Sequence, residues 1–268
     1  MSGPLGSSLS DFARAYAQHR ASEGRALGGE ALAALPYVRR GGPFAKQWAV
    51  RARSFEKFIS AVVMPMARMS GRRLHALDLG AGNGWLSHRL CSLGHLVTAV
   101  DIRDDDVDGL GAATSLQRKW PGRFERITAS FERLPLQGRR FDLVIFNASL
   151  HYARDLSRAI GEAIRMTVPA GVIAILDSPF YRCEADGAAM VAEKLVQGSA
   201  RFGGRANILL TQNFIEYLTP ERLAAAAPLS WQRHRVLYPL WYELRPMIAL
   251  LERSRAPSRF DVWTARVP

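Results

Sequence analysis

The segment Leu77–Gly84, Leu-Asp-Leu-Gly-Ala-Gly-Asn-Gly, constrains the fold of this chain more than any other feature of the sequence. An apolar stretch at 74–79 has the length and composition of a buried strand, and the residues at 85–93 have helical spacing. Glycines lack the Cβ atoms that would keep a ligand from the backbone, and the amides at a helix start favour acceptor groups. The segment therefore predicts a strand, a ligand-binding turn and a helix in succession.

The glycine spacing distinguishes this turn from the dinucleotide-binding fingerprint. The pattern G-x-G-x-x-G would place its third glycine where this chain has Trp85. This argues against NAD or FAD as the ligand. The structural alternative is a turn that serves only tight packing of a strand against a helix.

Strand-like and helix-like segments alternate through the middle of the chain. Short apolar runs rich in β-branched residues occur at 74–79, 96–102, 124–129, 141–148 and 172–177. Helical stretches lie between most of them, at 85–93, 107–120 and 155–167. Such alternation predicts right-handed βαβ crossovers and a parallel sheet with helices on both faces, in an α/β fold.

The two ends of the chain differ from this alternation. Residues 1–73 predict an N-terminal helical extension or lid, with one or two helices in 8–35 and an amphipathic helix that Pro65 kinks or ends. Residues 74–268 are expected to form one domain with an insertion at about 181–218. Its tail shows a helix at 220–227, strands at 231–238 and 260–267, and a helix at 241–254 between those strands.

Composition limits the class of protein. A chain of 268 residues, 48% of them hydrophobic, can bury a large core. Its two cysteines, Cys91 and Cys183, have neither disulfide-framework nor metal-site spacing. No apolar run reaches the length of a membrane span and the start lacks a signal-peptide core, which predicts a cytoplasmic protein without membrane insertion.

The net charge of +12 raises the question of nucleic-acid binding. Residues 74–180 carry 12 basic and 12 acidic side chains, so the predicted core is neutral, whereas residues 1–73 carry 12 and 4. The basic side chains are scattered rather than clustered. Nucleic-acid binding is therefore disfavoured but stays open.

Asp78 through Gly84 match without a gap the first motif of the class I S-adenosylmethionine-dependent methyltransferases, an acidic residue followed by G-x-G-x-G, and the chain resembles this family over residues 74–178. The resemblance implies a Rossmann-like, mostly parallel seven-stranded sheet with an antiparallel C-terminal strand, and S-adenosylmethionine as methyl donor. It also implies that Asp78 helps to hold the aminoacyl part of the donor. The donor is expected to lie against Gly80, Ala81, Gly82 and Gly84.

Further donor-binding residues are expected at the ends of the next strands. Asp101 ends the second strand, beside Ile102, where a carboxylate can accept both ribose hydroxyl protons; an ordinary helix cap is the alternative. Ser130 and Phe131 follow the third strand in a segment that resembles the adenine-binding segment of the family. Ser130 stands where the family typically has an acid, and Phe131 is expected to cover the ring.

The fourth strand resembles the next motif of the family. Its end points into the site, so Asn147 and Ala148 should border the donor, and His151 and Tyr152 the acceptor. We predict no metal, because a metal mechanism needs several convergent carboxylates and the strand ends in Asn147.

His151 and Asp177 are the candidate catalytic residues. His151 is the best candidate for a general base; a structural or donor-contacting histidine is the alternative. Asp177, after the fifth strand, could orient the acceptor or His151, or could cap the next helix.

Residues outside the motifs could complete the pocket. Arg51 or Arg53 could reach the donor carboxylate, or could simply be solvated. Four aromatic residues could wall the acceptor pocket, or could be ordinary core: Phe44, Trp48, Phe214 and Tyr217.

The sequence thus predicts a methyltransferase that acts on a small organic acceptor at oxygen. An RNA acceptor and a non-catalytic donor-binding scaffold are the alternatives. The acceptor, the methylated atom and the oligomeric state stay open.

Overall fold

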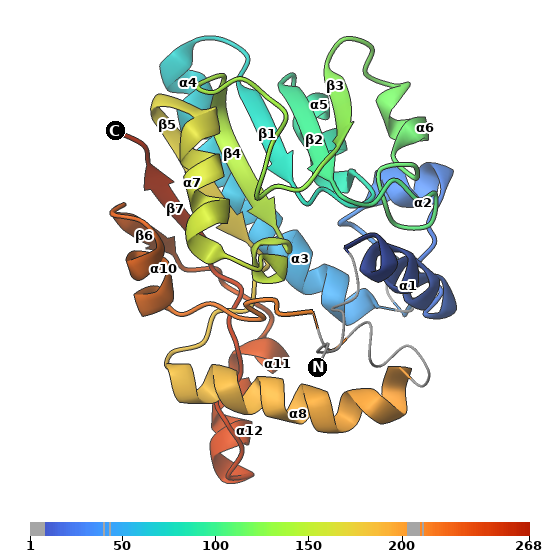
Figure 1. The fold of residues 1–268 in the computed structure, drawn as a ribbon, viewed down its shortest axis with the longest axis vertical. Helices are drawn as coiled ribbons and strands as arrows, with labels where there is room; N and C mark the ends of the chain where they lie inside the picture. The colour runs from blue at the N-terminus through green and yellow to red at the C-terminus, as the bar shows by residue number, and fades with distance from the viewer. Residues whose placement is uncertain (1–8, 40, 43, 203–209, 211) are drawn as a thin grey trace, which may run out of the picture.

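The core of the fold is a seven-stranded sheet, seen in a computed structural model that describes residues 9–39, 41–42, 44–202, 210 and 212–268. The strand order is β3-β2-β1-β4-β5-β7-β6 (Figure 1). The strands are β1 (His75–Leu79), β2 (Leu96–Asp101), β3 (Phe124–Thr128), β4 (Phe141–Asn147), β5 (Thr167–Leu176), β6 (Trp231–His234) and β7 (Val262–Arg266). Strands β1 to β5 pair in parallel, and β7 is antiparallel to both β5 and β6. This confirms the predicted fold class.

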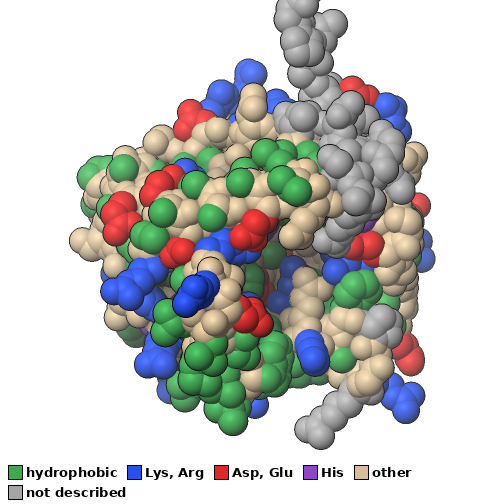
Figure 2. Space-filling view, turned by 90° about the horizontal axis from the view of Figure 1, so that it is seen from below, with side chains coloured by type: hydrophobic (Ala, Val, Ile, Leu, Met, Phe, Trp, Pro, Cys, Tyr) green, Lys and Arg blue, Asp and Glu red, His purple; other side chains and the backbone are tan. Residues whose placement is uncertain are grey.

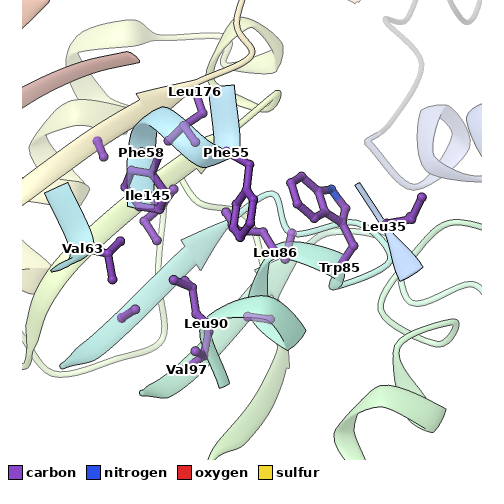
Figure 3. Close-up of a cluster of buried hydrophobic side chains, with 14 of the residues drawn as sticks. Leu35, Phe55, Phe58, Val63, Trp85, Leu86, Leu90, Val97, Ile145 and Leu176 are labelled. Atoms are coloured by element: carbon purple, nitrogen blue, oxygen red, sulfur yellow. The ribbon is translucent and has the colours of Figure 1, made fainter. Parts of the chain in front are cut away.

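Helices cover both faces of the sheet, and alternate residues of each strand serve the two faces. Leu143 and Ile145 of β4 pack with α3 (Ala45–Phe58) and α5 (Trp85–Ser92). Figure 3 shows part of this cluster, with side chains of both helices directed at the strands. Val144 and Phe146 pack on the opposite face with α7 (Leu156–Met166) and α10 (Pro220–Ala226). The period of two along a strand thus divides the core between two apolar layers.

The segment before β1 is helical, as predicted. Helices α1 (Leu9–Ser22) and α2 (Gly29–Ala34) are followed by α3, by a π-helical turn η1 (Ile59–Val63) and by α4 (Met64–Ser70). Pro65 stands in the first turn of α4, directly after the π turn, and cannot donate a backbone hydrogen bond. Helix α3 thus does not end at Pro65: it continues into α4 through the π turn η1, which replaces the α-helical pattern just ahead of Pro65.

The helix predicted at 107–120 is wrong in extent, because only α6 (Thr114–Gln117) forms there. The Asp105 carboxylate accepts hydrogen bonds from the amides of Val107, Asp108 and Gly109 and so folds the chain into a compact loop. A side-chain acceptor of this kind competes with helical hydrogen bonding. Similarly, the strand predicted at 231–238 ends at His234.

The tail adds helices at the lower end of the molecule as drawn in Figure 1. Helix α8 (Glu184–Phe202) lies in the predicted insertion, and α11 (Leu240–Glu243) and α12 (Arg245–Leu251) lie between β6 and β7. The predicted helix at 241–254 is thus present as two shorter helices. In the ranges that the structure describes, no helix combines the length and apolarity needed to cross a bilayer.

Candidate active site

A cavity of about 590 Å³ opens at the carboxyl ends of the central strands. Its walls come from the glycine turn after β1, from the ends of β2, β4 and β5, and from helices α1, α3 and α11. Eleven of the thirteen residues predicted for the site line it: Gly80, Ala81, Gly82, Asp101, Ile102, Ser130, Phe131, Asn147, Ala148, His151 and Asp177. The other two, Asp78 and Gly84, lie outside the lining.

The glycine turn is held against β2 by its own backbone. The amides of Gly80 and Ala81 both donate to the carbonyl of Val100, at 2.7 and 3.0 Å. Gly80 has a φ of 71°, and a Cβ atom there would lie 2.3 Å from the Cβ of Ser149. Both the left-handed backbone and the lack of space require glycine at this position.

Gly84 serves packing rather than the cavity. It stands before α5 with a φ of 71°, and a Cβ atom there would lie 2.9 Å from the Cβ of Ala113. The tight-packing explanation considered for the glycines therefore describes Gly84, whereas Gly80 and Gly82 border the cavity.

Asp78 lies beneath the turn and is fully buried. Its Oδ2 accepts a hydrogen bond from Ser87 Oγ at 2.7 Å, and its Oδ1 has no hydrogen-bond partner in the described parts of the chain. Burial raises the pKa of this carboxyl to about 7. Any effect of Asp78 on a ligand would therefore be transmitted through the turn above it.

Asp101 is 8% exposed and presents its carboxylate to the cavity. Oδ2 accepts from the Gly82 amide at 2.7 Å and Oδ1 from the Arg103 amide at 2.9 Å. Burial raises the pKa of Asp101, and the nearby charge of Arg103 opposes that rise. Since each carboxylate oxygen has capacity for a second hydrogen bond, Asp101 can still accept from ligand hydroxyl groups.

Helix α1 covers this end of the cavity. Phe12, Tyr16 and Arg20 all line it. Arg20 Nε donates to Asp108 Oδ2 at 2.6 Å, and the Tyr16 hydroxyl lies 3.1 Å from that of Tyr152. The spacing of four residues between the three α1 side chains, which puts them on one helix face, is the signal that could have identified them.

Asp108 also lines the cavity and is not identified by the sequence pattern. Its Oδ1 accepts from Asn83 Nδ2 at 2.8 Å while its Oδ2 accepts from Arg20. One buried carboxylate thereby joins the glycine turn to α1.

Asn147 has an unused hydrogen-bond acceptor. The residue is 8% exposed and lines the cavity, and its Oδ1 has no partner among the residues that the structure describes. Buried polar atoms without a partner are rare in proteins and need an explanation. A ligand with an N–H or ammonium group would supply the missing donor.

His151 lines the other end of the cavity, with Nδ1 3.4 Å from Ser178 Oγ. Burial lowers its pKa to about 3, and the charges of Lys194 and Arg51 act in the same direction. The imidazole is therefore neutral at physiological pH and is a weaker base than an ordinary histidine.

Asp177 is tied to α3 rather than to His151. Its Oδ1 accepts a hydrogen bond from Ser54 Oγ at 2.5 Å, and burial raises the pKa of this carboxyl. The Ser54 contact favours the view that Asp177 fixes α3 over the end of β5, and gives no support to Asp177 as the partner that orients His151.

Arg51 and Arg53 prove to have different surroundings. Arg51 lines the cavity, packs over the Trp48 ring at 5.0 Å and forms no salt bridge with the described residues. Arg53 is exposed and pairs with Glu56 at 3.1 Å. Of these two arginines, therefore, Arg51 is the one that places its cation at the cavity.

Of the four aromatic residues considered for the pocket wall, Trp48 and Phe214 line the cavity. Phe44 lies under the Arg25 guanidinium, and the Tyr217 hydroxyl donates to Glu184, so both belong to other parts of the molecule. Three aromatic residues that the sequence did not single out complete the wall: Trp241, Tyr242 and Phe260.

Residues 77–175 match the family model described as methyltransferase domain. A malonyl-[acyl-carrier protein] O-methyltransferase of Buchnera aphidicola is 33% identical over 97 residues, which cover 36% of each chain. An uncharacterized methyltransferase of Mycobacterium bovis is 34% identical over 100 residues, 37% of this chain and 48% of that protein. The chain thus matches between about a third and a half of the length of these curated relatives.

Solved structures resemble the whole chain. The [4+2]-cyclase SpnF has a TM-score of 0.61 at 16% identity and covers 100% of this chain and 99% of its own. The Burkholderia thailandensis 1,6-didemethyltoxoflavin N1-methyltransferase, solved with bound S-adenosylhomocysteine, has a TM-score of 0.54 at 18% identity, covering 100% and 93%. At these identities the likeness establishes the fold and not the reaction.

Proposed function

We propose that this chain, which belongs to the class I S-adenosylmethionine-dependent methyltransferases, transfers a methyl group from S-adenosylmethionine to an oxygen of a small organic acceptor. The observation that carries the proposal is that one cavity is lined both by Gly80 and Asp101 and by His151 and Arg51. Residues suited to a donor and residues suited to an acceptor thus share one enclosure of the size typical for small ligands.

The donor end fits the nucleoside and amino-acid parts of this cofactor. Asp101 would accept hydrogen bonds from ribose hydroxyls, Phe131 and Ser130 would contact the adenine, and the unpartnered Oδ1 of Asn147 would accept from the ammonium group. When bound, S-adenosylmethionine would supply a methyl group attached to a positively charged sulfur. The role of the protein is then to hold the acceptor oxygen in line with it.

We further propose that residues 1–73 act as the predicted lid over this end. Arg20 is fastened to Asp108, and Tyr16 meets Tyr152, so α1 excludes water from the turn that Gly80 and Gly82 form. Exclusion of water strengthens hydrogen bonds and charge interactions inside a site.

The acceptor end favours an oxygen that is already ionised. A histidine with a pKa lowered to about 3 removes a proton from an alcohol poorly. A carboxylate or an acidic phenol or enol needs no such base, and the charge of Arg51 would attract it. His151 would then position the acceptor as a neutral hydrogen-bonding group.

The test is transfer of a labelled methyl group to carboxylic acids, phenols, amines and RNA. We expect label in base-labile methyl esters or in aryl methyl ethers. Arg51→Met should raise the KM of an acidic acceptor about tenfold or more, since a hydrogen bond to a charged group contributes about 1.5–3 kcal/mol. Arg53→Met is the matched control, because this exposed arginine is paired with Glu56.

Other outcomes of this assay would assign a different acceptor, or a different role to Arg51. Label on RNA at physiological salt would identify a nucleic-acid acceptor, and label on amines would exclude oxygen. Donor binding without transfer to any acceptor would support the scaffold alternative. If Arg51→Met weakened binding of the donor alone, we would assign Arg51 to the donor carboxylate.

We propose the cytoplasm as the location of the reaction.

A further inference from the structure

The mouth of the cavity is bordered by a concentrated set of exposed apolar side chains. Seven of the thirteen large hydrophobic residues that are exposed in the described parts of the chain fall between positions 237 and 251. We call this set the apolar rim: Leu237, Leu240, Trp241, Met247, Ile248, Leu250 and Leu251. The four leucines are 72–77% exposed. Contiguous apolar surface of this kind marks an interaction site in a folded protein.

The rim is continuous with the candidate active site. Trp241 belongs to both, and its neighbours Tyr242 and Arg245 also line the cavity. In Figure 2, hydrophobic side chains gather beside a hollow in the surface, with Lys and Arg side chains close by. A molecule bound on the rim would therefore lie next to the cavity entrance.

The shape of the rim narrows the choice of partner. Helix α12 projects from the body of the molecule, and Ala249 is its single buried residue (Figure 1). The exposed apolar side chains of α12 share the broad helix face opposite Ala249, and a rigid partner would need a matching groove to bury them: Met247, Ile248, Leu250 and Leu251. A lipid layer deforms around such a projection, and Trp and Arg side chains beside it suit the headgroup region.

Basic residues around the rim indicate the charge of that surface. The Arg235 side chain is 70% exposed although it lies 4.0 Å from Glu243, and Arg253 is exposed beside the exposed Glu252. Lys46 lies over the Trp241 ring, 5.9 Å from its centre. Cations beside an apolar helix add electrostatic attraction to anionic lipids.

We propose that the apolar rim binds peripherally to an anionic lipid surface and that the cavity receives an amphiphilic acceptor from it. The acidic oxygen of the acceptor would reach Arg51, while its apolar body leaves the cavity over Trp241. The identity of the acceptor rests on the proposed function; the lipid binding of the rim does not.

Sedimentation with vesicles tests the lipid binding, using phosphatidylglycerol mixed with phosphatidylcholine and phosphatidylcholine alone. The full chain should bind the anionic vesicles and lose binding as salt rises. Leu250→Ser combined with Leu251→Ser should reduce binding at least about tenfold, because burial of one leucine favours association by roughly that factor. The matched control is Met69→Ser combined with Leu93→Ser, which removes exposed apolar side chains at the opposite ends of the strands and should leave binding unchanged.

The outcomes separate this proposal from the proposed function. The lipid proposal would be overturned if both double variants lost vesicle binding equally, or if the parent chain did not bind vesicles. A dimer in sedimentation velocity that the Leu250/Leu251 variant abolishes would assign the rim to a second copy of the chain instead. Calorimetry with S-adenosylhomocysteine should give equal affinity in parent and variant. If vesicles bind and no methyl transfer occurs, the proposed function fails while the lipid surface stands.

Discussion

Replacement of Asp101 by asparagine is the most direct test of the donor end of the cavity. The change keeps the shape of the side chain and one carbonyl oxygen, so the contact with either the Gly82 amide or the Arg103 amide can persist. It removes the negative charge from hydrogen bonds to two ribose hydroxyls. Hydrogen bonds to a charged group contribute about 1.5–3 kcal/mol and neutral ones about 0.5–1.5.

A loss of about 1 to 1.5 kcal/mol of binding free energy at each of two ribose hydroxyls gives a total of roughly 2–3 kcal/mol. Because 1.4 kcal/mol is a factor of ten in affinity, donor binding should weaken roughly 30- to 150-fold. Calorimetry with S-adenosylmethionine and S-adenosylhomocysteine measures this directly. Asp104→Asn, an exposed acid three residues further on, is the control and should bind as the parent does.

Thermal unfolding must accompany the calorimetry, because Asp101 also faces the buried guanidinium of Arg103 at 3.9 Å. A folded Asp101→Asn protein with unchanged affinity for both sulfur ligands would refute the ribose assignment. It would leave Asp101 as a structural acceptor for the Gly82 and Arg103 amides.

Three further predictions concern the turn, the acceptor end and the pH dependence of folding. Gly80→Ala should destabilise the protein by about 1–3 kcal/mol more than Gly94→Ala in urea unfolding, since both have positive φ but only position 80 lacks space for a Cβ atom; equal costs would contradict this. His151→Ala should lower kcat about tenfold and spare donor affinity, and a loss of 100-fold or more would restore His151 as a general base. His88 accepts a hydrogen bond from the Trp120 indole at 2.8 Å and has its pKa lowered to about 4 by burial, so the unfolded chain takes up a proton that the folded chain refuses. The contribution of His88 to the free energy of unfolding should therefore fall from pH 6.5 toward 4 by up to about 1.4 kcal/mol per unit. His88→Phe should reduce the slope by this contribution, whereas an unchanged slope would show that His88 has no part in it.

The sequence predicts the central sheet well because buried parallel strands are nearly continuous apolar runs. The runs at 96–102 and 141–148 each agree with a strand to within one residue. The helix predicted at 107–120 was wrong in extent because the fold of this segment depends on the Asp105 carboxylate, which accepts hydrogen bonds from three amides, and not on helical periodicity. The fifth strand begins at Thr167, earlier than the predicted 172, since pairing of Thr167 with Phe141 across a bulge overrides the local Pro-Ala-Gly turn signal.

The residues of the candidate site were likewise predicted only in part. Positions fixed by strand ends, such as Asp101 and Asn147, lie on the cavity as predicted. The spacing of the α1 residues shows that they share one helix face, but the position of that face over the cavity, like that of Trp241 on α11, depends on long-range packing. Their functional roles, and the division of the chain at residue 73, remain predictions.

The sheet order has a consequence for how this protein could be altered. Most residues proposed for the donor follow β1, β2 and β3, which form one half of the sheet, and Asn147 ends the neighbouring β4. The acceptor end is formed by Arg51 of α3, by His151 after β4, and by residues of α11 and of the approach to β7. Grafting the stretch between β5 and β7 from a homologue would therefore replace one wall of the cavity and leave Gly80 and Asp101 untouched. A library of such chimeras offers a route to new acceptors on a constant donor module.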